Sequence, residues 1–410
     1  MANVLIICRE FPNDMASGLH LRVHHLCRVL AQRHDCFLVD LSGREVDSAA
    51  QAAGPFREVL LMPPFPSTSG AKRRHLRLSN SHFLEQSFPG HFRETVRLLR
   101  TFADERSIDV VASFAPTKGE VGLALDLPKL IDLPDSDTLT TERMLANRGN
   151  ELSFAERLSA RLALWRGIGG ERRLVRGYDV ATTISEPDRR QLLKNSGVAD
   201  DRVVVLPNGV APEALSTGRQ RREAARSVVF WGNLDFPPNW TAVRHFYKNI
   251  YLPCLADQGV DWHILGRNPG PGIQAMASHP RIHLAGFQEH LFDYIADKGV
   301  MVNPMVEGSG LKNKVLEAFA VGLPVVSTQL GVDALPVTSG NECMIAEEPE
   351  AFARSVLALL EDSPERKGLC DRARVFVEQG YDWDLVGEQF AQLVSDITSQ
   401  TSPSDRLETA

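Results

Sequence analysis

The sequence has little of what marks a disulfide framework, a structural metal site or a membrane span. Its six cysteines are scattered over 410 residues, with no CxxC pair and no closely spaced histidine and cysteine ligands. A disulfide framework and a structural zinc site are therefore not expected, and a reducing cytoplasm fits this cysteine usage best. No stretch approaches the roughly 20 apolar residues that a spanning helix needs.

A secretory leader and a strongly basic surface are also missing. The opening MANVLIIC is apolar but short and has no basic leader, so it predicts a first strand rather than a signal peptide. The net charge of −7 argues against a general nucleic-acid binder. A chain of 410 residues is too long for one ordinary core and predicts two domains.

Short apolar runs alternate with amphipathic patterns in the first half of the chain. VLIIC (4–8), CFLVDL (36–41) and DVVASF (109–114) have the pattern of buried strands, and residues 19–33 have the pattern of a helix. DVATTIS (179–185) and RVVVLPNGV (202–210) also predict strands, and PKLIDLPDSDTL (128–139) contains a strand end. Residues 142–176 predict long helices that contain eight arginines. This alternation is typical of a doubly wound parallel sheet.

A second α/β series follows a polar, basic segment near residues 220–226. Its strand-like runs are 227–234, 260–266, 281–286, 299–305 and 323–328. We therefore predict an α/β fold of two Rossmann-like, doubly wound parallel-sheet domains that face a central cleft. Their expected limits are 1–215 for the first domain, 216–380 for the second, and 381–410 for a C-terminal helix that packs back on the first domain, followed by a disordered tail from residue 398.

The segment EGSGLKNKVLEAFAVGLP, residues 307–324, is the most informative in the chain. A strand runs into a loop with two glycines, and a helix of about ten residues then ends at Gly322, with Pro324 beyond it, as helix-stop chemistry predicts. A glycine loop and a helix N-terminus at the carboxyl end of a parallel strand favour an anion. A diphosphate is the natural occupant.

Three charged side chains in this segment fit such a ligand. Lys314 and Glu317 are three residues apart and share a helix face, so an ammonium can meet phosphate while a carboxylate accepts from ribose hydroxyls. Glu307, before the glycines, is placed to bind a second polyol such as a sugar. Taken alone, Lys314 and Glu317 would more often form an ordinary helix ion pair, but the glycine loop favours the binding site.

At this point the chain resembles family 4 of the retaining glycosyltransferases, the "glycosyl transferases group 1", which have the GT-B fold. The resemblance rests on the EGSG loop, Lys314, LEA and GLPVV. It is supported by ISEPD, VVVLPNGV, FWGNLDFPPNW, HILGRNP and HLAGF, which stand in the family's order and resemble members with a PPN sequence and a G-[LI]-[KR]-N-K-[VI]-LEA loop.

The resemblance implies a site for a nucleotide-sugar donor. Glu317 would bind the ribose, Glu307 the transferred sugar, and the glycine loop the phosphates. Gly18 would let the first domain approach the diphosphate, and Arg267, Gly286 and Phe287 would flank the base. The predicted donor-binding residues are Gly18, Gly232, Asn233, Arg267, Gly286, Phe287, Glu307, Gly308, Ser309, Gly310, Leu311, Lys314 and Glu317.

The chain departs from the family pattern in two places. Nine residues separate Glu307 from Glu317, where the family commonly has seven. The family's usual Arg and Lys after the first strand of the second domain are here Asn233 and Asn239. Because the leaving diphosphate still needs positive charge, we expect Lys314, and secondarily Lys312, to supply it.

The acceptor side is less sharply defined by the sequence. PKLIDLPDSDTL carries Asp132, Asp135 and Asp137 and resembles a D-x-x-D-x-D-S segment of some PPN-containing members; Asp132 and Asp135 are candidate catalytic residues, with Lys314 and Glu307. A polar loop cap explains these aspartates equally well. The predicted acceptor-binding residues are His20, Arg22 and His24, with surface histidines on an amphipathic helix as the plainer alternative.

Residues 72–100 hold a local surplus of positive charge, with seven Lys and Arg against two Glu. Such a stretch can dock an anionic bilayer or a lipid-diphosphate acceptor. A solvated charged face is the alternative explanation.

The sequence therefore predicts a retaining glycosyltransferase that moves a sugar from a nucleoside diphosphate sugar to a hydroxyl on a glycan, a lipid-linked sugar or a small glycoside. The resemblance implies a front-face mechanism, in which the leaving phosphate oxygen takes the acceptor proton, and neither a cofactor nor a metal. A cytoplasmic location is expected, with peripheral contact at the inner membrane face as an option. Two alternatives stay open: another GT-B enzyme, such as an epimerase or a phosphorylase, and a non-catalytic nucleotide-sugar-binding subunit.

Overall fold

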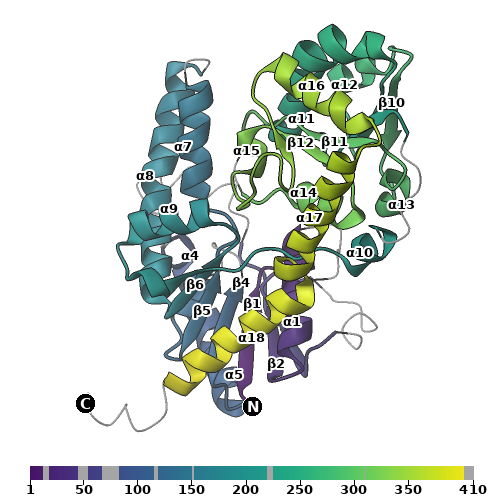
Figure 1. The fold of residues 1–410 in the computed structure, drawn as a ribbon. Helices are drawn as coiled ribbons and strands as arrows, with labels where there is room; N and C mark the ends of the chain where they lie inside the picture. Colours follow the sequence, from purple (N-terminus) through teal and green to yellow (C-terminus); the bar gives the residue numbers. More distant parts are fainter. Residues whose placement is uncertain are drawn as a thin grey trace. The chain divides into compact units, whose positions relative to one another are not determined.

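The chain folds into two compact units. The computed structural model describes residues 1–12, 18–44, 54–66, 83–114, 119–149, 152–218, 225–308 and 310–400. Unit 1 consists of Met1–Pro207 with Trp383–Ala410, and unit 2 is Asn208–Asp382 (Figure 1). The division after Pro207 falls inside the RVVVLPNGV sequence, and the sequence-based domain limit was residue 215.

Unit 1 is built on a seven-stranded sheet in the order β3-β2-β1-β4-β5-β6-β7, and every described pairing is parallel. All five residues of β4 are buried, as expected for a strand with helices on both faces. The strands are β1 (Asn3–Cys8), β2 (Asp35–Asp40), β3 (Glu58–Leu61), β4 (Val110–Phe114), β5 (Lys129–Asp132), β6 (Val180–Thr183) and β7 (Val203–Val205).

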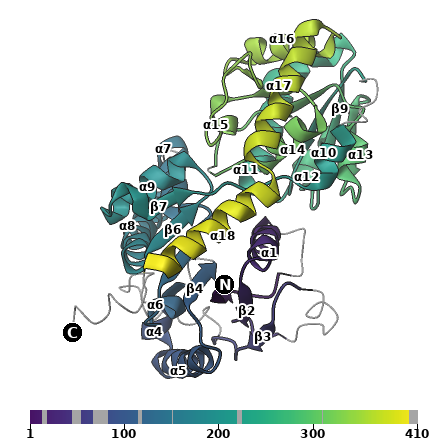
Figure 2. The same cartoon turned by 60° about the horizontal axis from the view of Figure 1, so that its bottom comes forward.

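Helices cover both faces of this sheet and build a core on each. On one face α1 and α18 lie side by side and pack Leu26 and Phe390 against β1 and β4 (Figure 1, Figure 2). On the other, α5 packs Leu99 against β1 and β4. The helices are α1 (Gly18–Leu30), α4 (Phe83–Ser87), α5 (Pro89–Glu105), α6 (Gly119–Leu123), α7 (Asp137–Arg148), α8 (Phe154–Gly177), α9 (Glu186–Ser196), the 3-10 turn η2 (Asp200–Arg202) and α18 (Trp383–Gln400).

Unit 2 is built on a six-stranded parallel sheet in the order β10-β9-β8-β11-β12-β13, with one core on each face. The strands are β8 (Ser227–Trp231), β9 (Asp261–Leu265), β10 (Ile282–Gly286), β11 (Val300–Asn303), β12 (Val325–Ser327) and β13 (Met344–Ile345). The helices are α10 (Pro212–Gly218), α11 (Pro237–His245), the π-helix η3 (Phe246–Leu255), the 3-10 turn η4 (Ala256–Gln258), α12 (Pro271–Met276), α13 (Leu291–Ile295), α14 (Asn313–Val321), α15 (Gln329–Val332), α16 (Pro349–Leu360) and α17 (Pro364–Gly380).

Two doubly wound parallel sheets are the fold that the sequence predicts, and the fold class is confirmed. Two short strands, β3 and β13, are not among the predicted ones; each lies at a sheet edge and has too few residues for a clear pattern. The expected disordered tail from residue 398 is wrong at its start, because α18 continues to Gln400. Of the helices in the described ranges, none combines the length and apolar character needed to span a bilayer.

Candidate active site

The predicted phosphate loop connects β11 to α14 in unit 2. Gly308 and Gly310 have φ of 108° and 72°, which side-chain-bearing residues rarely adopt. Helix α14 begins at Asn313 with no side-chain cap from Lys312, and ends at Gly322 in the left-handed conformation. The helix N-terminus that follows the glycine loop therefore has no capping side chain of its own.

Lys314 lies in the first turn of α14 and is half-buried. Its Nζ donates to Oδ1 of Asn239 at 2.7 Å and lies 4.1 Å from the centre of the Phe230 ring. Burial, and to a smaller extent the charge of Lys312, lower the pKa of Lys314 to about 7, although the charge of Glu317 opposes the shift. An anion bound here would favour the protonated form.

Glu317 lies one helical turn after Lys314 and is also half-buried. Its Oε2 accepts from Nε1 of Trp231, the last residue of β8, at 2.7 Å. Burial raises the pKa of Glu317, while the Trp231 hydrogen bond and the charge of Lys314 oppose this rise. The indole fixes one carboxylate oxygen, and the second oxygen remains an acceptor for a ligand hydroxyl.

The end of β8 approaches Lys314 closely because Gly232 has no side chain. A Cβ on Gly232 would lie 2.7 Å from Nδ2 of Asn239 and 3.3 Å from Nζ of Lys314. One on Gly266, after β9, would lie 1.8 Å from the carbonyl oxygen of Gly232. Asn239 also donates to the carbonyl of Asn233 at 3.0 Å. The structure thus brings together Gly232, Asn233 and Lys314.

Glu307 is held from the side by α11, the helix that begins with the PPN sequence. Oε1 of Glu307 accepts a hydrogen bond from Oγ1 of Thr241 at 2.7 Å, and Glu307 as a whole is only 8% exposed. A Cβ on Gly308 would lie 3.3 Å from Cβ of Pro238, so α11 also limits the space at the loop. These contacts fix the path of the chain into the glycine loop.

The rest of the loop makes contacts of a different kind. The carbonyl of Gly310 accepts from Nζ of Lys312 at 2.8 Å, and Leu311 packs against the apolar core beside α14. Ser309, a predicted donor-binding residue, lies outside the described residues. Lys312 is thus turned back onto its own loop, and Lys314 reaches β8.

The three residues predicted to flank the base lie after β9 and at the end of β10. The guanidinium of Arg267 lies 4.0 Å from the centre of the Phe287 ring, and Phe287 is 55% exposed. Gly286 has φ of 69°, and its carbonyl accepts from the amide of Gly266 at 2.8 Å. An exposed ring stacked on a guanidinium is a planar surface suited to another planar group.

In unit 1, Arg22 and Asp132 form a buried ion pair. Nε and Nη2 of Arg22 donate to the Asp132 carboxylate at 2.8 Å and 2.7 Å, and the two side chains are 1% and 0% exposed. Arg22 also donates to the carbonyls of Leu206 and Pro207, and Asp132 accepts from Thr182. The geometry favours structural roles for both residues over the acceptor-binding and catalytic roles predicted for them.

The other predicted residues of unit 1 lie on or near α1. His20 is buried with Nε2 3.2 Å from Glu10 Oε1, and His24 is half-buried with its ring 5.3 Å from that of His25. Burial lowers the pKa of His24. Gly18 opens α1 and has no atom within 4 Å of a Cβ built on it.

Asp135 is exposed in the turn between β5 and α7, where the next residue is a helix cap. Ser136 accepts from the amide of Leu139 and donates to the buried Glu171 at 2.9 Å. The Glu171 carboxylate also accepts from Thr138. The DSD sequence therefore contains a polar cap, one of the two explanations that the sequence allows.

Sequence reasoning missed two side chains that position the predicted carboxylates. Trp231 binds Glu317 and Thr241 binds Glu307. Both stand within the FWGNLDFPPNW motif and its next residue, so the signal that could have found them is their position at the end of β8 or shortly after it. Their partners are remote in sequence and cannot be derived from spacing.

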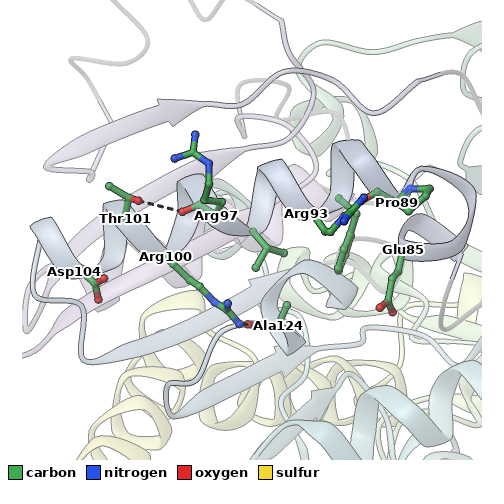
Figure 3. A pocket seen from close by; sticks show the side chains of 10 residues that line it. Glu85, Pro89, Arg93, Arg97, Arg100, Thr101, Asp104 and Ala124 are labelled. Atoms are coloured by element: carbon green, nitrogen blue, oxygen red, sulfur yellow. Dashed lines mark hydrogen bonds between the residues drawn. The ribbon is translucent and has the colours of Figure 1, made fainter.

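A surface hollow of about 500 Å³ lies in unit 1, along α5 (Figure 3). It is lined by Arg93, Arg97 and Arg100 with Glu85 and Ala124, among others, and contains none of the predicted site residues. Nη2 of Arg100 donates to the carbonyl of Ala124 at 2.8 Å.

The basic stretch 72–100 is described only from residue 83 onward, so its first four Lys and Arg residues lie outside the described residues. Within the described ranges, no group of three or more potential metal-ligating side chains gathers.

Comparison with known proteins identifies two family matches. Residues 225–362 match the family described as Glycosyl transferases group 1, and residues 17–209 match the Glycosyl transferase 4-like domain. Between them the two matches span most of both units.

Two curated proteins are similar to part of the chain. An uncharacterized 44.6 kDa protein in the cps region of Klebsiella pneumoniae is 29% identical over 38% of this chain and 42% of its own length. An exopolysaccharide phosphotransferase of Streptomyces coelicolor is 22% identical over 59% of this chain and 26% of its own length. The chain thus spans less than half the length of these relatives.

Solved structures resemble the whole chain in fold. Sucrose-phosphate synthase from Thermosynechococcus elongatus has a TM-score of 0.66 at 14% identity, covering 98% of this chain and 100% of that one. HepE of Anabaena, solved in complex with UDP and glucose, has a TM-score of 0.62 at 14% identity, covering 96% and 100%. At this identity the likeness concerns the fold.

Proposed function

Because this chain belongs to the glycosyl transferases group 1 family, we propose that it is a retaining enzyme that transfers a sugar from a nucleoside diphosphate sugar to a hydroxyl acceptor. The observation that carries the proposal is the cluster at the start of α14. There a half-buried Lys314 hydrogen-bonds Asn239, and Glu317 hydrogen-bonds Trp231. This cluster lies beside a glycine loop at the carboxyl end of a parallel sheet, where α/β proteins bind nucleotides.

The donor diphosphate would lie at the glycine loop, with its negative charge against Lys314. The pKa of this lysine is about 7 in the free protein, so the site presents a mixture of ammonium and amine near neutral pH. A diphosphate would pull the equilibrium toward the ammonium. Glu317 would accept from the ribose hydroxyls, and Glu307, held by Thr241, from hydroxyls of the sugar.

Transfer breaks the bond between the anomeric carbon and the phosphate oxygen and forms a bond from that carbon to the acceptor oxygen. In the front-face course implied by the family, the acceptor proton goes to the leaving phosphate oxygen. Negative charge grows on the diphosphate as the bond breaks, and a preorganised cation there is worth a few kcal/mol of barrier. Lys314 supplies that charge in this proposal, in place of the family's Arg and Lys.

The Arg267 and Phe287 pair would receive the base. The ring is exposed and the guanidinium is stacked on it at 4.0 Å, so a base has a flat surface to stack on at the end of β10. The name of HepE's structure includes UDP, and a second HepE structure is described with UDP-glucose. UDP-sugars are therefore the first donors to test.

The acceptor belongs to glycan or glycoconjugate biosynthesis in this proposal. The similar Klebsiella protein is named for the cps region, and the similar Streptomyces protein is called an exopolysaccharide phosphotransferase. The second name concerns an exopolysaccharide. A growing glycan or a lipid-linked sugar is therefore a better first acceptor than a small glycoside.

A thermal-shift screen of UDP-, GDP-, ADP- and dTDP-sugars tests the donor site. A ligand at a hundred times its Kd stabilises the fold by about 2.7 kcal/mol, so the true donor should give the largest rise in Tm. The Lys314→Ala variant should lose most of this rise, whereas Lys312→Ala should keep it. No rise with any nucleotide sugar would contradict the donor assignment.

Turnover then separates transfer from the two alternatives. The best donor is incubated with a panel of glycan and lipid-linked acceptors, with and without EDTA, and release of nucleoside diphosphate is measured. Release that requires an acceptor supports transfer, and its persistence in EDTA supports a reaction without metal. Release without any acceptor would favour another GT-B reaction. Tight binding without release would favour a non-catalytic subunit, an option that Asn233 and Asn239 raise.

A further inference from the structure

One helix of unit 1 carries a stripe of large apolar side chains on its exposed face. Phe154, Leu158, Leu162 and Trp165 on α8 are 82%, 57%, 37% and 66% exposed. Their spacing of four, four and three residues places them on one side of the helix. We refer to these four residues as the α8 stripe.

The stripe has no role in the core of unit 1. The buried residues of α8 are Gly170, Glu171, Leu174 and Val175, and all of them lie in the second half of the helix. The first half pairs with α7 as a helical hairpin that projects from the sheet of unit 1 (Figure 1). The stripe therefore adds exposed apolar surface without a packing function, which is a mark of an interaction surface.

The charges on α8 are strongly positive, although the chain as a whole has a net charge of −7. The helix holds six arginines and two glutamates. One glutamate, Glu171, is buried in hydrogen bonds with Ser136 and Thr138. The other, Glu156, is held by the capping box with Ser153. Helical spacing places the exposed Arg161 on one border of the stripe, whereas Nε and Nη2 of Arg166, on the other border, are buried.

From this combination we infer that the α7–α8 hairpin docks unit 1 on an anionic lipid surface, with the α8 stripe in the headgroup region. Helices that lie in a bilayer interface carry Trp, Phe and Leu on one face and Arg or Lys beside them. Tryptophan side chains are enriched at the level of the headgroups, where Trp165 would lie. A projecting convex stripe also meets a planar surface without needing a complementary groove.

A second copy of the chain fits this surface less well. Two α8 stripes packed against one another would bring the exposed Arg161 side chains of both copies together. The exposed part of α8 offers only Glu156 to balance them, and the capping box already holds that carboxylate. Like charges in contact disfavour the pairing, whereas anionic headgroups satisfy the same arginines.

The basic stretch 72–100 has a different character where it is described. Arg97 pairs with Glu94, and Arg93 donates to the carbonyl of Pro89. Among the described residues of α4 and α5, none is an exposed large apolar side chain. Charge without an apolar face gives weak, salt-sensitive attraction, so the α8 stripe is the stronger membrane contact of the two.

Vesicle flotation of the full chain without donor tests the inference independently of turnover. The vesicles are phosphatidylcholine alone, or phosphatidylcholine and phosphatidylglycerol in equal parts. The wild-type chain should float with the anionic vesicles, and the Phe154→Ser/Trp165→Ser variant should not. The control is Val375→Ser, which removes an exposed apolar side chain from unit 2 and should float like the wild type. Equal flotation of all three chains would overturn the inference.

Two further measurements identify the occupant. Replacing one border arginine, by Arg161→Gln, should weaken binding to anionic vesicles about fivefold. Lipids brominated in the acyl chains should quench tryptophan emission in the wild type, and the Trp165→Phe variant should lose this quenching. Light scattering is measured in parallel: a dimer that the Phe154→Ser/Trp165→Ser change makes monomeric, together with no flotation, would assign the stripe to a second copy. Because donor stabilisation is measured separately, the lipid and donor proposals can fail independently.

Discussion

Both units place charged side chains near the carboxyl ends of their parallel strands, but they satisfy them in opposite ways. In unit 1 the Arg22 guanidinium donates hydrogen bonds to the Asp132 carboxylate and to the carbonyls of Leu206 and Pro207. In unit 2 the described residues place no ion-pair partner on Lys314, whose ammonium is bonded to the neutral amide of Asn239.

This difference separates a structural charge from a ligand-binding one. A fully paired, fully buried ion pair leaves nothing for a ligand to gain. A half-buried lysine with a lowered pKa gains an interaction when an anion arrives. Residue type alone does not distinguish the two, since Asp132 and Lys314 are both charged residues after or near a strand end.

The largest expected effect is the loss of the ion pair in unit 1. Asp132→Ala would leave the Arg22 guanidinium buried without its counter-charge, a change that typically costs 3–5 kcal/mol, so we expect about that loss of stability. Because the two units can unfold separately, hydrogen exchange of β5 and β7 is the appropriate measurement, with β8 as the internal reference.

The exposed Asp135 provides the matched control. Asp135→Ala should leave the exchange of β5 unchanged. If the Asp132→Ala variant kept wild-type protection against hydrogen exchange and instead had lower turnover, the structural role of Asp132 would be contradicted. The catalytic role predicted from the sequence would then be supported.

The next largest effect falls on Lys314. Lys314→Ala should lower turnover at least tenfold, since a preorganised cation on the leaving diphosphate is worth a few kcal/mol. Release of nucleoside diphosphate measures turnover, and an unchanged Tm without ligand verifies folding. Lys312→Ala should have a smaller effect, because Nζ of Lys312 is bonded to the Gly310 carbonyl. Wild-type turnover in Lys314→Ala would remove the assignment.

The sequence was sufficient for the fold because the evidence for it is local. A buried strand such as DVVASF can be identified from its continuous apolar character. Gly322 ends α14 in the left-handed conformation that its position after the helix predicts. The strands β3 and β13 were missed because short edge strands have too few residues to establish a period. The end of α18 was misplaced because TSQ is as compatible with a last helical turn as with a tail.

The site could be predicted only in part. The EGSG loop, Lys314 and Glu317 share one strand-loop-helix unit, so spacing alone brings them together. Arg22 and Asp132 are remote in sequence, and nothing in either motif reveals that they neutralise one another. The partner of Glu317, Trp231, likewise comes from a neighbouring strand, and only sheet order places it there.

A third prediction concerns pH and sharpens the comparison at Lys314. Burial lowers the pKa of this lysine to about 7 in the free protein, and a bound diphosphate should raise it. Binding then takes up a proton above pH 7, so the Kd for UDP should rise with pH, toward a limit of about tenfold per unit. Calorimetry in buffers of different ionisation heat measures the uptake. The Lys314→Ala variant should bind UDP with no such dependence; a flat profile in the wild-type chain would contradict the proposed contact.

The smallest effects distinguish the two carboxylates of unit 2 from one another. Trp231→Phe removes the hydrogen bond to Glu317. This change should weaken the binding of UDP and of the UDP-sugar alike, about tenfold, because a hydrogen bond to a charged group contributes about 1.5 kcal/mol. Thr241→Val removes the hydrogen bond to Glu307 and should weaken only the binding of the UDP-sugar, about fivefold. The contrast follows from the assigned partners: Glu317 would bind the ribose, which both ligands contain, and Glu307 the sugar, which UDP lacks. Equal weakening of both ligands by Thr241→Val would mean that Glu307 supports the loop as a whole and does not contact the sugar.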